Sequence, residues 1–122
     1  DIASSGQISD YYDMESIHNQ VRSARLSLYR IISGQSDADK EAVILEQKYK
    51  RVWNRIYMTT SGTDKIRSTM ADIKSESYQN EFLAAQIKVR ELSRRAQFLR
   101  DELRVLESLA NDYRQMIRSS QQ

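Results

Sequence analysis

Basic and aromatic side chains alternate over a short segment near the middle of the chain, a combination that could bind a nucleic acid. Four basic residues lie within eight positions, with no acidic residue among them: Lys48, Lys50, Arg51 and Arg55. Trp53 and Tyr57 accompany them. Cationic side chains bind backbone phosphates, and aromatic rings stack on unpaired bases. The segment therefore predicts binding of a single-stranded nucleic acid, with the basic residues on phosphates and Trp53 or Tyr57 as stacking partners.

The same segment has a second, purely structural interpretation. On a helix, where each residue turns by about 100°, Lys48, Arg51 and Arg55 share one flank of the apolar stripe. Trp53 and Tyr57 lie on the opposite flank, where they could pack in the core beside a solvated basic edge. The stretch from Lys88 to Arg100 has five basic residues and one acidic residue, and it could contact phosphates or form ion pairs with neighbouring helices.

Few residues are available for catalysis or for binding metals. The chain has one His and no Cys, so a nucleophilic triad could involve only His18. Its three Gly residues are isolated, which leaves no phosphate-binding loop. Glu15 and His18 have the Glu-x-x-His spacing of di-iron bundles, but such sites need a second pair and two more carboxylates. We therefore expect no enzymatic activity, no metal site and no cofactor.

Composition favours a small all-α domain. The 122 residues are 30% charged and 39% hydrophobic, with no Pro, so the turns that a sandwich or barrel needs are missing. A net charge of +2 excludes binding to nucleic acid by bulk charge alone. No apolar run approaches the roughly 18 residues of a membrane span. We expect a soluble, cytoplasmic protein without a membrane partner.

Apolar periodicity predicts a flexible tail over residues 1–9 and a single helical domain over residues 10–122. The first helix covers 10–33 and ends at Gly34, which has the position of a left-handed cap. The basic helix covers 37–60, begins at Ser36–Asp39 and ends before Gly62. Two apolar stripes with steps of three and four residues support these helices. They are Met14, Ile17, Val21, Ala24, Leu28 and Ile31, followed by Ala42, Leu45, Tyr49, Val52 and Ile56.

Two further helices are expected after Thr63. A short one covers 64–75, with Ile66, Met70 and Ile73 as its apolar face, and a long one covers 77–118. The phase of the stripe slips between Lys74 and Ser77, which predicts a kink or a short break there. In the long helix the stripe continues for nearly six heptads from Tyr78 to Ile117.

The length of the last helix predicts self-association. About 40 residues span about 60 Å, whereas a compact chain of this size is only about 35 Å across. The two shorter helices could not cover such a stripe, so we expect a helical bundle or coiled-coil homo-oligomer. The oligomerisation residues would be Leu92, Leu99, Leu103, Leu106, Tyr113 and Ile117.

The order of these parts resembles the phage recombination mediator family typified by UvsY. The resemblance rests on residues 46–51 (Glu-Gln-Lys-Tyr-Lys-Arg), Ser61-Gly62, the amphipathic stretch 65–70, and the closing segments 98–103 and 114–117. It covers roughly residues 40–118. The family usually has a Tyr-Tyr pair where this chain has Thr59-Thr60, and of its late basic positions only Arg55 matches.

The resemblance implies a small all-helical protein that forms a ring-like homo-oligomer through its C-terminal helices. It also implies binding to single-stranded DNA, contact with a single-strand-binding protein, and loading of a RecA-like recombinase in a phage-infected host cell. The alternative is a structural or adaptor helical bundle, such as a virion, scaffold or secretion component with no nucleic-acid role.

Overall fold

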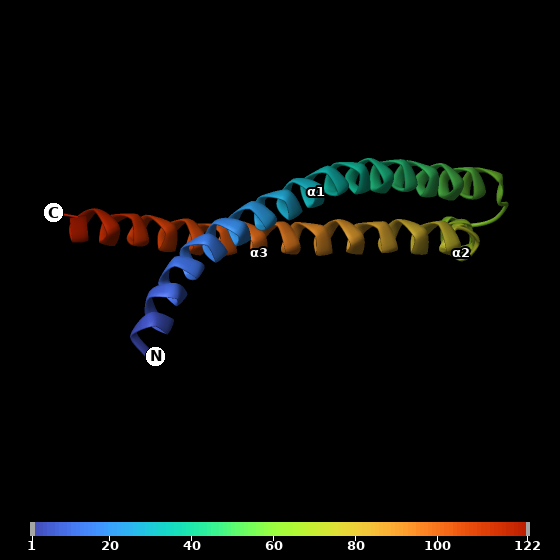
Figure 1. Cartoon of the computed structure of the whole chain (residues 1–122). Coiled ribbons are helices and arrows are strands. Elements are labelled where there is room, and N and C mark those ends of the chain that lie inside the picture. Colours follow the sequence, from blue (N-terminus) through green and yellow to red (C-terminus); the bar gives the residue numbers. More distant parts are fainter. Residues whose placement is uncertain (1, 122) are drawn as a thin grey trace. The chain divides into compact units, whose positions relative to one another are not determined.

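The computed structural model describes residues 2–121, with the side chains of residues 14–121. Three helices follow one another: α1 (Ile2–Thr59), α2 (Asp64–Lys74) and α3 (Glu76–Gln121) (Figure 1). No strand occurs among these residues, so the predicted all-α fold is confirmed. The chain divides into two compact units. Unit 1 combines Asp1–Ile32 with Arg94–Gln122, and unit 2 is Ser33–Ser93.

The predicted break between the first two helices is wrong, because α1 runs without interruption through Gly34 and Ser36. Gly34 keeps a helical backbone, and Gly62 is the residue with positive φ in the described part of the chain. The physical reason is that the two apolar stripes have the same phase. Gln35 and Ala38 continue the alternation of four and three residues, and Ala38 is only 3% exposed. A helix whose buried face is continuous has no reason to stop at a single Gly.

The predicted tail over residues 1–9 is corrected as well. Asp1 lies outside the described residues, and α1 begins at Ile2. This segment contains no Pro, and extending an existing helix is far easier than nucleating a new one.

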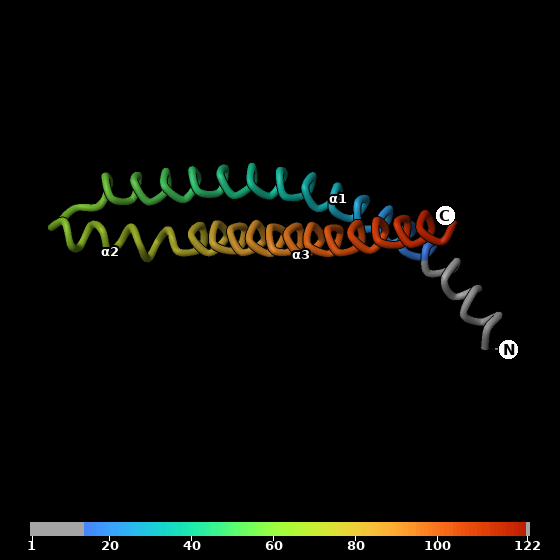
Figure 2. The backbone as a smooth tube through the Cα atoms, turned by 90° about the vertical axis from the view of Figure 1, so that its left-hand side faces the viewer, coloured from blue at the N-terminus to red at the C-terminus, as the bar shows by residue number. Residues whose placement is uncertain are grey.

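Unit 2 is a helical hairpin that closes at Gly62 (Figure 2). At the end of α1, the Thr60 hydroxyl and amide both donate to the carbonyl oxygen of Ile56, at 2.6 and 3.0 Å. Gly62 then has a φ of +122°, in the region that favours glycine. Thr63 caps α2, because its hydroxyl accepts a hydrogen bond from the amide of Ile66. The predicted end of the basic helix and start of the short helix are both confirmed to within a residue.

The predicted kink near Lys74–Ser77 is also observed, at Ser75 between α2 and α3. Ser75 is fully buried, and its hydroxyl donates to the carbonyl oxygen of Ala71 at 2.5 Å. Backbone bonds from Ser75 to Ala71 and from Gln79 to Ser75 continue across the junction. Such back-bonding by serine is associated with bends in helices, which agrees with the junction of α2 and α3 at this residue.

The predicted apolar face of the short helix is wrong at two of its three residues, since only Met70 is half-buried. Ile66 and Ile73 are 51% and 61% exposed, whereas Ala71 and Ser75 are buried. Ala71 and Ser75 continue the phase of the α3 stripe at Tyr78, so the small residues of α2 face α1. Small side chains allow the closer approach that the hairpin end needs.

In unit 1, the α3 stripe packs against α1 of the same chain. The buried residues are Ile17 and Ala24 from α1 and Ala96, Leu103, Leu106 and Ala110 from α3. This corrects the premise of the oligomer prediction, because the continuous α1 supplies the cover that two shorter helices could not. Of the other predicted oligomerisation residues, Leu99 and Tyr113 of this unit and Leu92 of unit 2 are half-buried, and Ile117 remains exposed. Over the described residues, none of the three helices has the length and apolar character that a membrane crossing requires.

Candidate nucleic-acid interface

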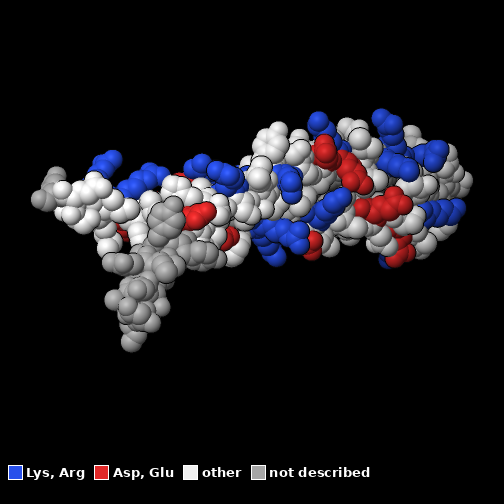
Figure 3. Space-filling model, viewed as in Figure 1, with Lys and Arg blue, Asp and Glu red and all other residues white. Residues whose placement is uncertain are grey.

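The predicted phosphate-binding residues all lie on the last part of α1, in unit 2, and all four are exposed. We call Lys48, Lys50, Arg51 and Arg55 the basic surface. The segment Gln47–Thr63 contains no acidic residue. Its side chains therefore carry a net positive charge at the end of unit 2 where α1 leads into α2. Figure 3 shows Lys and Arg side chains gathered there, with Asp and Glu side chains beside them.

Members of the basic surface differ in what they contact. Lys50 pairs with Glu46 one turn earlier, with 2.7 Å between Nζ and Oε1. The Lys48 ammonium lies over the ring of Tyr78, 5.3 Å from its centroid. Arg51 and Arg55 take part in no salt bridge among the described side chains. These two guanidinium groups therefore remain available for an external anion.

Trp53 and Tyr57 stack on each other and bind α2. Their ring centroids are 5.2 Å apart with an interplanar angle of 9°. Trp53 Nε1 donates to Asp72 Oδ1 at 2.7 Å, and the Tyr57 hydroxyl donates to Asp64. Both rings are half-buried. Their position favours the packing interpretation that the sequence left open, and stacking on bases stays a prediction.

Arg67 completes this arrangement from α2. Its Nε donates to the carbonyl oxygen of Tyr57 at 2.9 Å, and its guanidinium carbon lies 4.3 Å from the centroid of the Tyr57 ring. The hydrogen bond satisfies a carbonyl in the last turn of α1, where no intrahelical partner exists. We call Trp53, Tyr57, Asp64, Arg67 and Asp72 the corner cluster.

The hydrogen bond to the Asp64 carboxylate raises the pKa of Tyr57 above 10.0, the ordinary value. Partial burial and the negative charge of Asp64 act in the same direction, and the charge of Arg67 opposes them. The phenol is therefore held in its neutral, donating form. A neutral phenol keeps the hydrogen bond that ties the end of α1 to the start of α2.

Sequence reasoning missed three members of the corner cluster: Asp64, Arg67 and Asp72. The sequence pattern places Asp64 only at the start of the helix expected over 64–75. The available signal was that Trp53 and Tyr57, one turn apart, each need a hydrogen-bond partner when partly buried. Two aspartates eight residues apart on the next short helix could supply those partners, but their pairing depends on the sharp turn at Gly62.

The other candidate residues lie outside the basic surface and the corner cluster. Lys88 and Arg90 belong to unit 2, whereas Arg94, Arg95 and Arg100 belong to unit 1. All five are exposed, and within the described part of the chain none forms a salt bridge. Glu15 and His18 are exposed on α1, and no group of three potential metal-ligating side chains forms among the residues that the structure describes.

Comparisons with known proteins add no relative. No protein-family model matches the chain, and neither a curated protein nor a solved structure shows a match.

Proposed function

We propose that this chain is a non-enzymatic protein that binds single-stranded DNA through the basic surface and acts as a recombination mediator. The observation that supports it most directly is that Arg51 and Arg55 are exposed, lie one helical turn apart, and form no salt bridge within the described part of the chain. Two guanidinium groups so placed can each bind a phosphate through two parallel hydrogen bonds.

The corner cluster supports this role indirectly. It joins α2 to α1 through three hydrogen bonds that involve Trp53, Tyr57 and Arg67. The segment that carries the basic surface is thereby held in one conformation, so less conformational entropy is lost when a strand binds. Lys48 and Lys50 add positive charge from the same turns of α1.

The partners follow from the resemblance to phage recombination mediators. In this proposal the bound strand is taken over from a single-strand-binding protein and passed to a RecA-like recombinase in the cytoplasm of an infected host cell. Chemistry is left to the recombinase, which agrees with the shortage of catalytic residues in this chain.

A homo-oligomer remains part of the proposal, but through a different face of α3. Four apolar residues recur at steps of seven and four: Phe98, Val105, Leu109 and Met116. They are 68%, 60%, 43% and 67% exposed, and Glu102 interrupts them. We call these four residues the outer stripe. It lies beside the buried stripe, because each member precedes a residue of that stripe by one position.

Two pairs of positions give the outer stripe a self-complementary pattern, although the same register sets Glu102 opposite Val105 and Glu91 opposite Met116. Arg95 precedes it by three residues, and Asp112 lies between Leu109 and Met116. If two copies of α3 pack antiparallel about a twofold axis between residues 103 and 104, Phe98 faces Leu109 of the second copy. The same register places Arg95 opposite Asp112, and the symmetry repeats both pairs. We therefore propose an antiparallel dimer of α3 as the unit of assembly.

Fluorescence anisotropy with a labelled (dT)20 strand tests the DNA proposal. For the double variant Arg51→Ala/Arg55→Ala, the slope of log affinity against log salt should become less steep by about 1.4, as expected for two lost phosphate contacts. The matched control, Arg30→Ala/Arg104→Ala, removes the same charge from exposed positions of unit 1 and should keep the wild-type slope. Equal slopes for both variants would exclude the basic surface as the binding site.

A structural or adaptor protein is the second candidate. The outer stripe favours it, since an exposed apolar row points to protein contacts. This candidate predicts no binding of (dT)20 by the wild-type chain at either about 50 or about 200 mM salt, a range over which phosphate-mediated binding changes by orders of magnitude.

A further inference from the structure

The ring of Tyr78, near the start of α3, lies beneath one member of the basic surface. The Lys48 ammonium is 5.3 Å from the centroid of this ring. Lys48 is exposed, and within the described part of the chain it forms no salt bridge. A flexible lysine side chain can move aside without any change in the helices. The face of the Tyr78 ring can therefore be uncovered, although the ring as a whole is half-buried.

Trp53 and Tyr57, the two rings predicted to stack on bases, are occupied differently. They stack on each other, and their polar groups bind the two aspartates of the corner cluster. Arg67 also covers the Tyr57 ring. A base could stack on either ring only by breaking contacts that join α1 to α2. On Tyr78, by contrast, a base would displace the Lys48 ammonium.

Lys74 lies on the same side of unit 2 as Tyr78. Asp72 binds Trp53, which places Asp72 on the aromatic flank of the hairpin. On a helix, the residue two positions later points about 200° away, so Lys74 lies on the opposite flank. Tyr78 follows Lys74 by four residues, and backbone hydrogen bonds continue across Ser75. The two side chains therefore share one face.

Lys74 also lies opposite Arg51, at the same level of the hairpin. Residues 48 and 53 of α1 contact residues 78 and 72, respectively. Arg51 lies between the first two in sequence, and Lys74 lies between the second two. Lys74 is exposed and has no salt-bridge partner among the described side chains. A cation on the second helix therefore faces the same solvent as the basic surface.

Acidic residues limit this positive region to the closed end of the hairpin. Glu41 precedes Lys48 by seven residues, and Glu81 follows Lys74 by seven. Each acid thus continues the same flank away from the turn, and both are exposed. An anionic strand is therefore attracted to the end of unit 2 rather than along its whole length.

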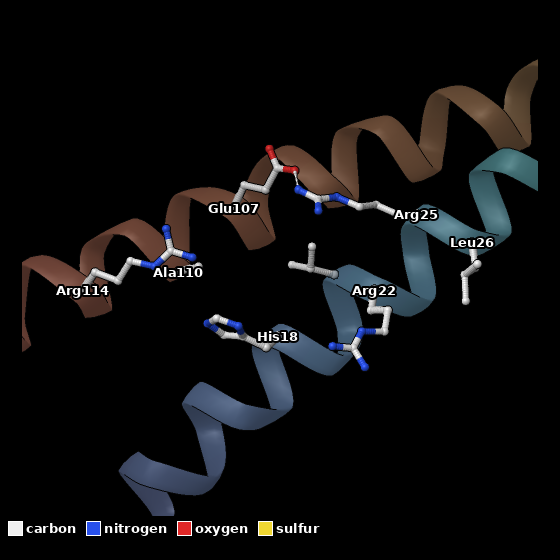
Figure 4. Close-up of a pocket in the computed structure, with 8 residues that line it drawn as sticks. His18, Arg22, Arg25, Leu26, Glu107, Ala110 and Arg114 are labelled. Atoms are coloured by element: carbon white, nitrogen blue, oxygen red, sulfur yellow. Dashed lines mark hydrogen bonds and ion pairs between the residues drawn. The ribbon is translucent and has the colours of Figure 1, made fainter.

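The groove between residues 18–26 of α1 and 107–114 of α3, in unit 1, has no such arrangement. In Figure 4, Arg22 and Leu26 lie on the side of α1 away from α3. Arg25 is held by Glu107, with 2.9 Å between its Nη2 and Oε1 of the carboxylate. Arg22 and Arg25 therefore do not converge on one anion.

We propose that a single strand crosses from α1 to the junction of α2 and α3, where Lys74 binds a phosphate and a base stacks on Tyr78. This inference rests on the proposed function and adds a second wall to its binding site. The base replaces the Lys48 ammonium over the ring, and that ammonium binds a phosphate instead. A duplex keeps its bases stacked on each other, so it cannot use the ring. Tyr78 therefore favours single strands over duplex DNA.

Anisotropy of labelled (dT)20 at several salt concentrations tests Tyr78. In Tyr78→Leu, affinity should fall about tenfold at every salt concentration with the wild-type salt slope, because stacking adds no phosphate contact. Affinity for a duplex of the same length should stay unchanged. Tyr78→Phe retains the ring and should bind like the wild-type chain. The matched control Tyr113→Leu changes another half-buried tyrosine of the α3 stripe, in unit 1, and should keep the wild-type affinity.

The slope of log affinity against log salt tests Lys74. Lys74→Gln should make the slope less steep by about 0.7, the change expected for one lost phosphate contact with a single strand. Lys65→Gln is the matched control, since Lys65 is also exposed on α2 and lies nine residues earlier, about 180° round the helix. It should keep the wild-type slope. Circular dichroism confirms that every variant is folded.

The outcomes separate this inference from the proposed function. If the wild-type chain does not bind (dT)20, both are overturned. If it binds and Arg51→Ala/Arg55→Ala has the shallower slope, while Tyr78→Leu and Lys74→Gln match their controls, the proposed function stands and this inference alone is overturned. An effect in only one of the two would overturn the role of the other residue.

Discussion

Arg67 donates a hydrogen bond from Nε to the carbonyl oxygen of Tyr57, 2.9 Å away, while its guanidinium lies over the ring of the same residue. One side chain from α2 thus binds both the backbone and the side chain of the last turn of α1. The hairpin of unit 2 is held at its closed end by this contact and by the two aspartates that bind Trp53 and Tyr57.

Replacing Arg67 by Met should lower the free energy of unfolding by about 1–2 kcal/mol. The carbonyl of Tyr57 would lose its partner, and the cation over the ring would be gone. Urea unfolding followed by Trp53 emission measures this, because Trp53 is the only Trp in the chain and stacks on Tyr57. The exposed neighbour Lys65→Met is the control and should change stability by less than about 0.5 kcal/mol. Equal effects of the two substitutions would contradict the role given to Arg67.

Stability should fall at high pH through Tyr57. Its pKa is raised in the folded chain, so the folded state holds the phenolic proton more tightly than the unfolded state does. The resulting stabilisation is complete below the unfolded pKa of 10.0 and is lost as pH rises through the higher folded pKa. Tyr57→Phe removes this contribution. The difference in unfolding free energy between wild type and Tyr57→Phe should therefore be constant near neutral pH and decrease above pH 10. A difference that does not change with pH would exclude the Tyr57–Asp64 hydrogen bond as its source.

Two glycine substitutions should have opposite signs. Gly34→Ala should stabilise the chain by about 0.5–1 kcal/mol, because Ala is the better helix former and nothing lies within 4 Å of an added Cβ. Gly62→Ala should destabilise it by about 1 kcal/mol or more, since φ is +122° there. Thermal unfolding of both variants measures this, and the midpoint temperature should rise for Gly34→Ala and fall for Gly62→Ala. Destabilisation by Gly34→Ala would contradict the continuous helix and would support the helix end that the sequence analysis predicted at Gly34.

The two glycines also show how far sequence can go in predicting this fold. The expected helix start after Thr63 and the expected helix end before Gly62 were enough to place the start of α2 and the close of the hairpin. Gly34 misled the prediction because a lone Gly before Ser and Asp resembles a cap. The better indicator was the phase of the apolar stripes on either side of Gly34. Gln35 and Ala38 continue the spacing of four and three residues from Ile31 to Ala42, so the two stripes form one. That single error also produced the prediction that α3 could not be covered within one chain.

Dimer formation and core packing should respond to different substitutions. Phe98→Ser/Leu109→Ser should abolish association in sedimentation velocity without lowering the unfolding free energy, because both side chains are exposed. Leu106→Ala should lower stability by about 2–5 kcal/mol through the cavity that it leaves, while the folded protein still associates. Association unchanged in the serine variant would exclude the outer stripe.

The charge register of that dimer has its own test. Arg95→Glu should weaken association, because it places two acids together at each end of the interface. Adding Asp112→Arg should restore association by reversing the pair. Failure of the second substitution to rescue the first would exclude the antiparallel register between residues 103 and 104.

The candidate site was less predictable than the helices. Spacing on one helix correctly separated Lys48, Arg51 and Arg55 from Trp53 and Tyr57, because both sets lie on α1. It could not show that the aromatic flank faces Asp64 and Asp72, since those contacts form only after the chain reverses at Gly62. The salt bridge between Arg25 and Glu107 was not predictable for the same reason, because its partners come from distant parts of the sequence.

In unit 1, the two segments that pack together are synthesised far apart in time. Arg25 and Glu107 are 82 residues apart in the chain, whereas Trp53 and Asp72 are 19 apart. During translation, Ile17 and Ala24 leave the ribosome long before Leu103 and Leu106 exist to cover them. The hairpin of unit 2 can close early because its loop is short. Ile17 and Ala24 therefore wait for Leu103 and Leu106, and a nascent chain that stops before about residue 100 exposes them to chaperones and proteases.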